Sequence, residues 1–206
     1  MDSKGGFYPF KLVVITIFAL LSLLVAPAGA ADSATQVIEN LHAELLAVMK
    51  QANELGYEGR YQRLDPIVTS SYDLPFIAKF VMGRQWKTLS GEQKSEFVKT
   101  FTKLSIATYA ANFSGYSGER FKTISNEELR KSRLLVKSVL IRSSGGEVTL
   151  DYVLHQRENR WRIINAIAEG VSDLSLKRAD YSSYLKKKGF DALLKKLNEK
   201  IQNYAK

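Results

Sequence analysis

The chain has 206 residues, a net charge of +9 and no cysteine. The absence of cysteine excludes disulfide bonds, a lipid-modified cysteine anchor and cysteine-based zinc sites. The length without its first thirty residues suits one domain that buries roughly 70% of its unfolded surface.

Residues 1–30 have the layout of a secretory signal peptide. Lys4 and Lys11 form a basic start, residues 12–25 are almost entirely apolar, and Ala28-Gly29-Ala30 is a small-residue cleavage site. The apolar run of 14 residues is shorter than the ~20 that a membrane-spanning helix needs. We therefore expect cleavage near Ala30, export to the periplasm and one folded domain over residues 31–206. An uncleaved membrane anchor is the alternative.

The positive charge is concentrated at the C-terminus, because residues 177–206 alone carry a net charge of +6. In an exported protein such a surface indicates anionic lipid head groups or acidic proteins as partners rather than nucleic acid. Lys186, Lys187 and Lys188 are the candidate docking residues. The alternative is a solvated helix end.

The first part of the exported chain is predicted to be helical. A stripe of apolar residues at helical spacing predicts a helix over residues 33–54, with Ser33 as its N-cap and Gly56 as its stop. A polar helix over residues 57–64 and a short helix over residues 65–72 should follow.

Two further helices are indicated by their capping residues. Asp73 and Pro75 are typical of a helix start, and Gly83 should end that helix. Ser90 and Gln93 have the spacing of a capping box and start the longest helix, which should extend to about residue 112.

Residues 134–168 contain three runs rich in β-branched and aromatic residues, separated by turn residues, which predicts an antiparallel meander. Residues 121–125 are a candidate edge strand, and the charged residues 126–133 should link it to the meander. A turn over residues 169–172 and two C-terminal helices, separated by Gly189, complete the chain. The fold class is therefore α+β, with a curled antiparallel sheet of about four strands packed against helices.

The second run of the meander predicts a sheet with one apolar face. Val148, Leu150, Tyr152 and Leu154 alternate with more polar residues, so they should point to the same side. In the third run Trp161, Ile163 and Ile167 continue that period. This face must be covered, either by side chains of the protein or by a ligand.

The sequence carries few signs of catalysis or metal binding. We interpret His42 as a partly exposed structural histidine and His155 as a solvated one. Gly115-Tyr116-Ser117-Gly118 lacks the G-x-S-x-G form of a hydrolase nucleophile, and no phosphate-binding glycine loop or metal motif occurs. We expect no catalytic residue, no metal and no cofactor.

Several segments, in the same order and spacing, resemble the toluene-tolerance (MlaC) family of periplasmic lipid-binding proteins. Residues 107–113 with 118–121 are most similar to its hopanoid-biosynthesis-associated (HpnM) branch. Asn165 departs from the family pattern, which has an acidic residue there, and Met82 stands where Leu is usual. The segments that carry the resemblance are Tyr72-Asp73-Leu74-Pro75-Phe76-Ile77-Ala78, Gly83-Arg84-Gln85-Trp86, Leu89-Ser90, Tyr116-Ser117-Gly118-Glu119, Trp161-Arg162-Ile163-Ile164, Glu169-Gly170-Val171-Ser172 and Gly189-Phe190-Asp191-Ala192-Leu193-Leu194.

The resemblance implies an NTF2-like cone with a deep apolar pocket for lipid tails. It also implies a soluble, monomeric carrier that moves phospholipid or hopanoid between inner- and outer-membrane complexes and is not an enzyme. The residues expected to line the pocket are Phe76, Ile77, Phe80, Phe101, Leu104, Ala107, Val139, Ile141, Val148, Leu150, Tyr152, Leu154, Trp161, Ile163 and Ile167.

Two alternatives stay open. The first is an enzyme that acts on a lipid or polyprenoid in the same pocket, which would need an ionisable residue inside it. The second is a scaffold without ligand, whose cone is filled by its own side chains.

Overall fold

The computed structural model describes residues 28–206. The predicted signal peptide therefore lies outside the described residues up to residue 27. The first helix, α1 (Ala28–Lys50), begins at Ala28, ahead of the predicted cap Ser33. Ala34, Ile38, Leu41 and Leu45 lie on its fully buried face.

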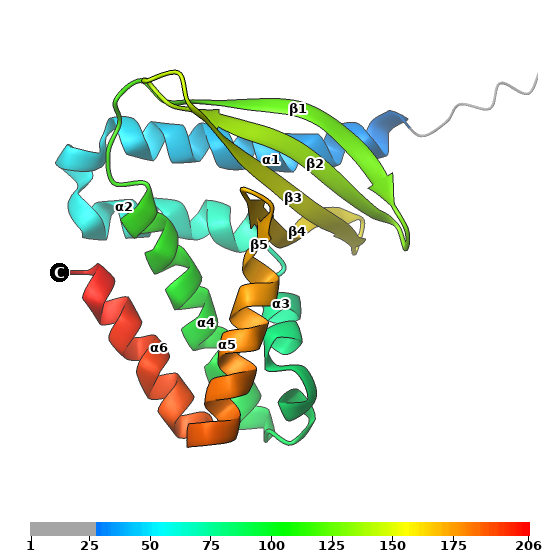
Figure 1. Cartoon of the computed structure of the whole chain (residues 1–206), viewed down its shortest axis with the longest axis vertical. Helices are drawn as coiled ribbons and strands as arrows, with labels where there is room; N and C mark the ends of the chain where they lie inside the picture. The colour runs from blue at the N-terminus through cyan, green and yellow to red at the C-terminus, as the bar shows by residue number, and fades with distance from the viewer. Residues whose placement is uncertain (1–27) are drawn as a thin grey trace, which may run out of the picture.

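Helix α2 (Ala52–Ser71) folds back along α1 as its antiparallel neighbour (Figure 1). The reversal uses Gly56, whose φ of 57° is strained for any residue with a side chain. The separate helices predicted on either side of Asp65 are one helix, because Pro66 is accommodated within α2.

Helices α3 (Leu74–Met82) and α4 (Gly91–Asn112) begin at the predicted caps. The Asp73 carboxylate accepts a hydrogen bond from the backbone N–H of Phe76, and Ser90 and Gln93 form the reciprocal capping box. The short 3-10 helix η1 (Gly83–Lys87) joins them.

The predicted α+β class is confirmed, with a sheet of five antiparallel strands in sequence order rather than about four. Its strands are β1 (Arg120–Leu129), β2 (Arg133–Ile141), β3 (Glu147–Arg157), β4 (Arg160–Ala168) and β5 (Val171–Ser172). Two predictions were wrong here. The first half of the expected linker over residues 126–133 continues β1, and the last two residues of the expected turn over residues 169–172 form β5.

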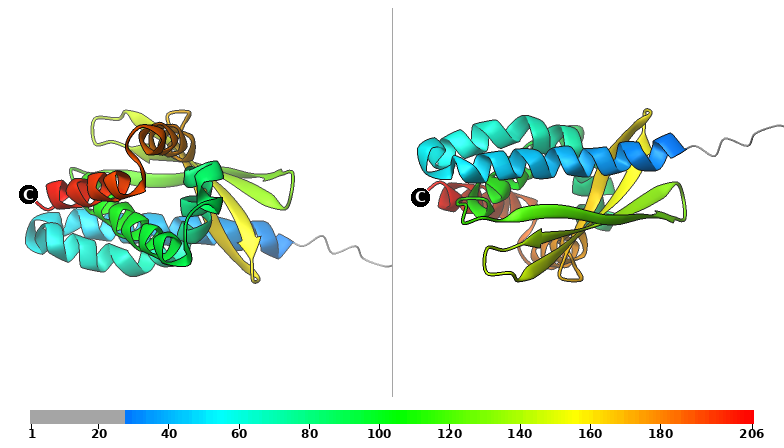
Figure 2. Two further views of the ribbon diagram at one scale, coloured as in Figure 1. Left: turned by 90° about the horizontal axis from the view of Figure 1, so that it is seen from below. Right: turned by 90° about the horizontal axis from the view of Figure 1, so that it is seen from above.

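Two irregularities curl the sheet. The pairing of β1 with β2 shifts around Ile124, and the pairing of β3 with β4 shifts around Ile164. Such bulges increase local twist and bend the strand that carries the extra residue. Figure 2 shows the resulting twist of the long strands relative to one another.

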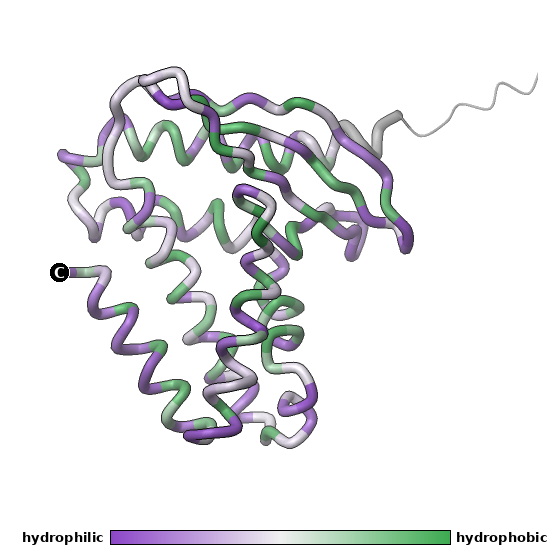
Figure 3. The backbone as a smooth tube through the Cα atoms, in the orientation of Figure 1, coloured by the Kyte–Doolittle hydropathy of each residue, from purple (hydrophilic) through white to green (hydrophobic). Residues whose placement is uncertain are grey.

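Helices α5 (Asp173–Lys188) and α6 (Phe190–Tyr204) complete the fold, with Gly189 between them at a φ of 83°. Helix α1 lies against β1, β2 and β4, while α4 packs between α2 and α6. In Figure 3 the hydrophilic residues of this region gather along α6 and at its junction with α5. No helix within residues 28–206 combines the length and apolar character needed to cross a bilayer.

Candidate functional site

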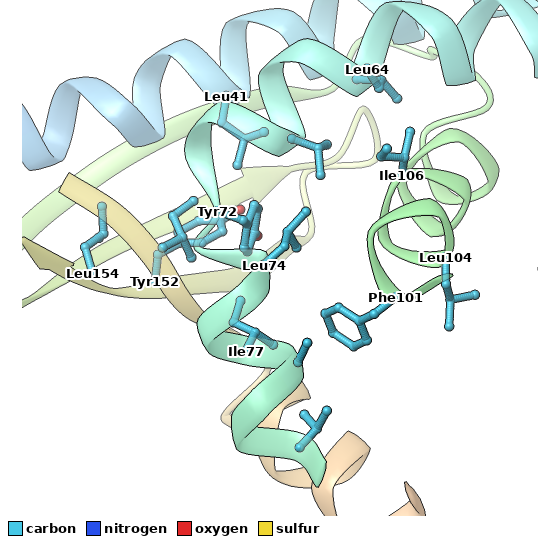
Figure 4. Packing of buried hydrophobic residues seen from close by; sticks show 14 of the residues in the cluster. Leu41, Leu64, Tyr72, Leu74, Ile77, Phe101, Leu104, Ile106, Tyr152 and Leu154 are labelled. Atoms are coloured by element: carbon cyan, nitrogen blue, oxygen red, sulfur yellow. The ribbon is translucent and has the colours of Figure 1, made fainter. Parts of the chain in front are cut away.

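A cavity of about 220 Å³ lies between the sheet and helices α3, α4 and α5. Figure 4 shows Tyr72, Ile77 and Phe101, three of its lining residues, within the buried cluster around α3 and α4. The full lining consists of Val68, Tyr72, Leu74, Ile77, Phe101, Ser105, Thr108, Tyr109, Asn112, Phe113, Leu150, Tyr152, Ala166, Ala168, Asp173 and Lys177.

The sheet leaves room for the cavity because two of the residues that face it are alanines. Leu150 of β3 pairs with Ala168 of β4, and Tyr152 pairs with Ala166. Directly opposed residues in an antiparallel pair project to the same face. The alanines therefore leave space where larger residues would fill the core.

The helix wall is less polar than its composition indicates. Ser105 and Thr108 of α4 line the cavity, but their hydroxyl groups donate to the carbonyl oxygens of Phe101 and Leu104 on the same helix. Because these hydroxyls are already paired, they demand no hydrogen bond from a ligand. The wall can therefore accept hydrocarbon.

Three tyrosine hydroxyl groups are also paired within the protein. The hydroxyls of Tyr72 and Tyr109 bond to each other, and that of Tyr152 bonds to Nε2 of His42. Burial raises the pKa of Tyr109 to about 12 and the pKa of Tyr152 well above its ordinary value. These tyrosines are therefore neutral at ordinary pH.

His42 is buried rather than partly exposed as predicted, with 4% of its surface accessible. Its ring stacks on Phe121 at a centroid distance of 4.3 Å, and burial lowers its pKa to about 4. The neutral imidazole is hydrogen-bonded to the Tyr152 hydroxyl and is not among the residues that line the cavity.

The exposed lining residues show where the cavity opens. Asn112 at the end of α4, Ala168 at the end of β4 and Asp173 at the start of α5 are all accessible to solvent. Lys177 donates to both carboxylate oxygens of Asp173 across one turn of α5. We call these four residues the mouth of the cavity.

Asn165 attaches the start of α5 to the sheet. Its side-chain oxygen accepts hydrogen bonds from the Ser172 hydroxyl and from the backbone N–H of Leu174. This role needs only an acceptor, so the amide at this position serves where an acidic residue was expected.

The structure brings four of the fifteen predicted pocket residues to the cavity: Ile77, Phe101, Leu150 and Tyr152. Ile167 is on the opposite face, where it pairs with Asp151. The bulge at Ile164 reverses the alternation of β4, which a simple period of two does not reveal.

Val139 and Ile141 were also assigned to the wrong face of the sheet. Val139 pairs with Thr149, on the side away from Leu150. The inward residue just before Val139 is Ser138, which is 1% exposed and donates to the Leu150 carbonyl oxygen. Strand β2 carries apolar residues on both faces and a polar residue on each, Lys137 and Ser138, so its sequence gives no clear alternation from which to choose.

The remaining predicted residues are not cavity-lining. Leu104, Ala107, Leu154, Trp161 and Ile163 are buried in the protein's own packing. Two others lie on α3: Phe76 packs against His155, and Phe80 is exposed beneath the Arg178 guanidinium. Val148 is half-buried and lies outside the lining.

His155 is not the solvated residue we expected. Its Nε2 atom is 2.9 Å from Oδ2 of Asp73, beside a polar hollow that Arg157 and Arg162 also line. The Arg162 guanidinium donates to the carbonyl oxygens of Thr69 and Tyr72 at the end of α2. These charged groups are satisfied by the fold.

Sequence reasoning missed the alanines, the hydroxyl residues and the charged pair of the cavity. Small residues and hydroxyl residues do not stand out in an apolar pattern. For the charged pair a signal exists, because Asp173 and Lys177 are four residues apart on a predicted helix, a spacing that favours an ion pair.

The comparisons with known proteins agree with this architecture. The model of the family described as MlaC protein matches residues 39–199. The intermembrane phospholipid transport system binding protein MlaC of Haemophilus influenzae is 26% identical over 197 residues, covering 92% of each chain. The structure of a phospholipid-binding protein from Ralstonia solanacearum in complex with a phospholipid aligns with a TM-score of 0.75 at 20% identity, covering 84% of this chain and 99% of that one. The chain belongs to the MlaC protein family.

Proposed function

We propose that this protein is a periplasmic carrier that holds the tails of a phospholipid or hopanoid in the cavity and moves them between membrane complexes. The observation that carries the proposal is the cavity wall: it is apolar, and its hydroxyl groups are paired within the protein. The name of the Haemophilus influenzae relative and the phospholipid bound to the Ralstonia solanacearum protein support it.

Burial of hydrocarbon would supply the affinity. Each CH₂ group removed from water contributes ~0.8 kcal/mol, so ten buried groups contribute about 8 kcal/mol before the cost of ordering the chain. The head group would remain at the mouth in contact with water, so the interior needs no polar recognition.

Loading requires the cavity to widen. Its volume of about 220 Å³ is below the roughly 300–1,000 Å³ typical of sites for drug-sized ligands, and a two-tailed lipid is larger than those ligands. The sheet must therefore separate from α3 and α4. Release would need a partner that binds the open state better than the closed one.

The test is to purify the exported protein without detergent from an envelope fraction and to weigh it intact by native mass spectrometry. We expect about one lipid per protein, identified after extraction. A preparation free of lipid that also takes up none from vesicles would exclude the carrier function.

The same preparation can also test the alternative that the protein is an enzyme acting on a lipid in the cavity. Among the lining residues, the side chains that carry charge are Asp173 and Lys177, which pair with each other at the mouth. Chemical conversion of an offered lipid, at a rate abolished by changing either residue, would favour the enzyme over the carrier.

A further inference from the structure

We infer that Asp173 and Lys177 form a head-group site selective for zwitterionic phospholipids, an inference that rests on the carrier function proposed above. Both residues project from the first turns of α5 at the mouth of the cavity. The pair presents one positive and one negative charge where the head group of a loaded lipid would emerge.

Lys177 is unusually withdrawn from solvent for a lysine. Its side chain is 23% exposed, while that of Asp173 is 54% exposed. Lysine is normally among the most exposed residues. Here its stem lies along the cavity lining and its ammonium group turns back to Asp173, so the charge sits at the boundary between hydrocarbon and water.

Asp173 also acts electrostatically on the cavity lining. Burial raises the pKa of Tyr109, the hydrogen bond to Tyr72 lowers it, and the negative charge of Asp173 raises it. The carboxylate is thus close enough to the tyrosine pair to influence it. A cation held by Asp173 would therefore lie at the mouth of the cavity.

The pair is suited to exchange its partners for those of a head group. An ion pair at the protein surface contributes only ~0–1 kcal/mol, and Asp173 is exposed, so little is lost when the pair separates. A lipid phosphate can replace the carboxylate at Lys177 as a charge-assisted acceptor. The freed Asp173 can then bind the ammonium group of the same zwitterionic lipid.

The same arrangement disfavours two other cargoes. An anionic head group satisfies Lys177 but places its charge beside an uncompensated Asp173, which is a repulsive element of the kind that gives specificity. A hopanoid without a charged head group leaves both residues without new partners. The cargo class is therefore a zwitterionic phospholipid such as phosphatidylethanolamine.

The test offers the exported protein vesicles with equal amounts of phosphatidylethanolamine and phosphatidylglycerol, then quantifies the lipid on the re-isolated protein. We expect at least about fivefold enrichment of phosphatidylethanolamine. Asp173→Asn should bring the ratio to about one, and Lys177→Gln should lower retention of both lipids. Asp180→Asn is the matched control, because it removes an acid of the same helix that pairs with Lys196 away from the cavity.

Each outcome bears on one claim. Equal retention of both lipids by the unaltered protein, with no effect of Asp173→Asn, would overturn the selectivity and leave the carrier intact. Retention of neither lipid would overturn the carrier itself. A further arm adds water-soluble glycerophosphoethanolamine as a competitor. If it displaced bound lipid as effectively as added phosphatidylethanolamine does, the site would bind a free head group rather than a lipid.

Discussion

At the scale of single residues, the cavity depends on side chains that are paired behind it. His42 illustrates this, since it is buried, bonds to Tyr152 at 3.1 Å between Nε2 and the hydroxyl oxygen, and remains neutral. A buried neutral histidine must gain a proton when the chain unfolds below its unfolded pKa. The folded state is therefore penalised as the pH falls.

The first prediction concerns this pH dependence. The pKa of His42 falls from 6.5 to about 4 on folding, so between pH 6.5 and pH 4 the unfolded chain binds more protons. The histidine should cost about 3 kcal/mol of stability over that window, with no cost above pH 6.5. Urea unfolding of His42→Gln and the unaltered protein at pH 7, 5.5 and 4.5 checks this. Parallel pH profiles for the two proteins would show that His42 does not titrate as stated.

A second prediction places an indole on either side of β3. Leu150 lines the cavity, whereas its neighbour Thr149 points to the other face and is exposed. Leu150→Trp should lower lipid retention at least about tenfold, because displacing only two CH₂ groups costs ~1.6 kcal/mol. Thr149→Trp should retain lipid normally. Uptake from vesicles, measured alongside thermal unfolding, compares them, and equal uptake by both variants would contradict the assigned wall.

At the scale of elements, the sequence signals differ in how much they reveal. The caps Asp73 and Ser90 are visible because specific polar side chains recur at fixed spacing, and the face of β3 is visible because Thr149 and Asp151 alternate with apolar residues. Strand β2 lacks such alternation. The bulge at Ile164 is equally hidden, because Ile163 and Ile164 are consecutive apolar residues and both are buried. Strand pairing rather than composition decides which residues after them turn inward.

The third prediction compares the two caps. Asp73 is 3% exposed and also bonds to His155 and Arg157, whereas Ser90 is exposed. Ser90→Ala should cost about 1 kcal/mol. Asp73→Ala removes a cap and takes the acceptor from the partly buried His155 as well, so it should cost about 3 kcal/mol. Denaturant unfolding at pH 7 measures both losses. Similar values would mean that the contacts of Asp73 beyond its cap contribute nothing.

At the scale of the whole molecule, the cavity and the basic region occupy different ends of α5. Asp173 at its start lines the cavity mouth, while Lys186, Lys187 and Lys188 at its end are exposed beside the start of α6. Lysines in the last turn of a helix also stabilise that helix, because their positive charge interacts favourably with the helix dipole. Their positions fit a membrane-docking role as well as that structural one, so a measurement must separate the two.

The fourth prediction separates them by salt. If the three lysines guide the carrier to anionic membranes, replacing all three with Gln should slow lipid transfer to anionic vesicles about threefold to tenfold at about 0.01 M salt, where charges act over ~30 Å. The difference should vanish at about 1 M salt, where they act over ~3 Å. Replacing the exposed Lys87, Lys99 and Lys103 with Gln removes the same charge from η1 and α4 and should have a smaller effect. Equal slowing by both triple variants would point to net charge alone, because a docking surface acts through the position of its charges.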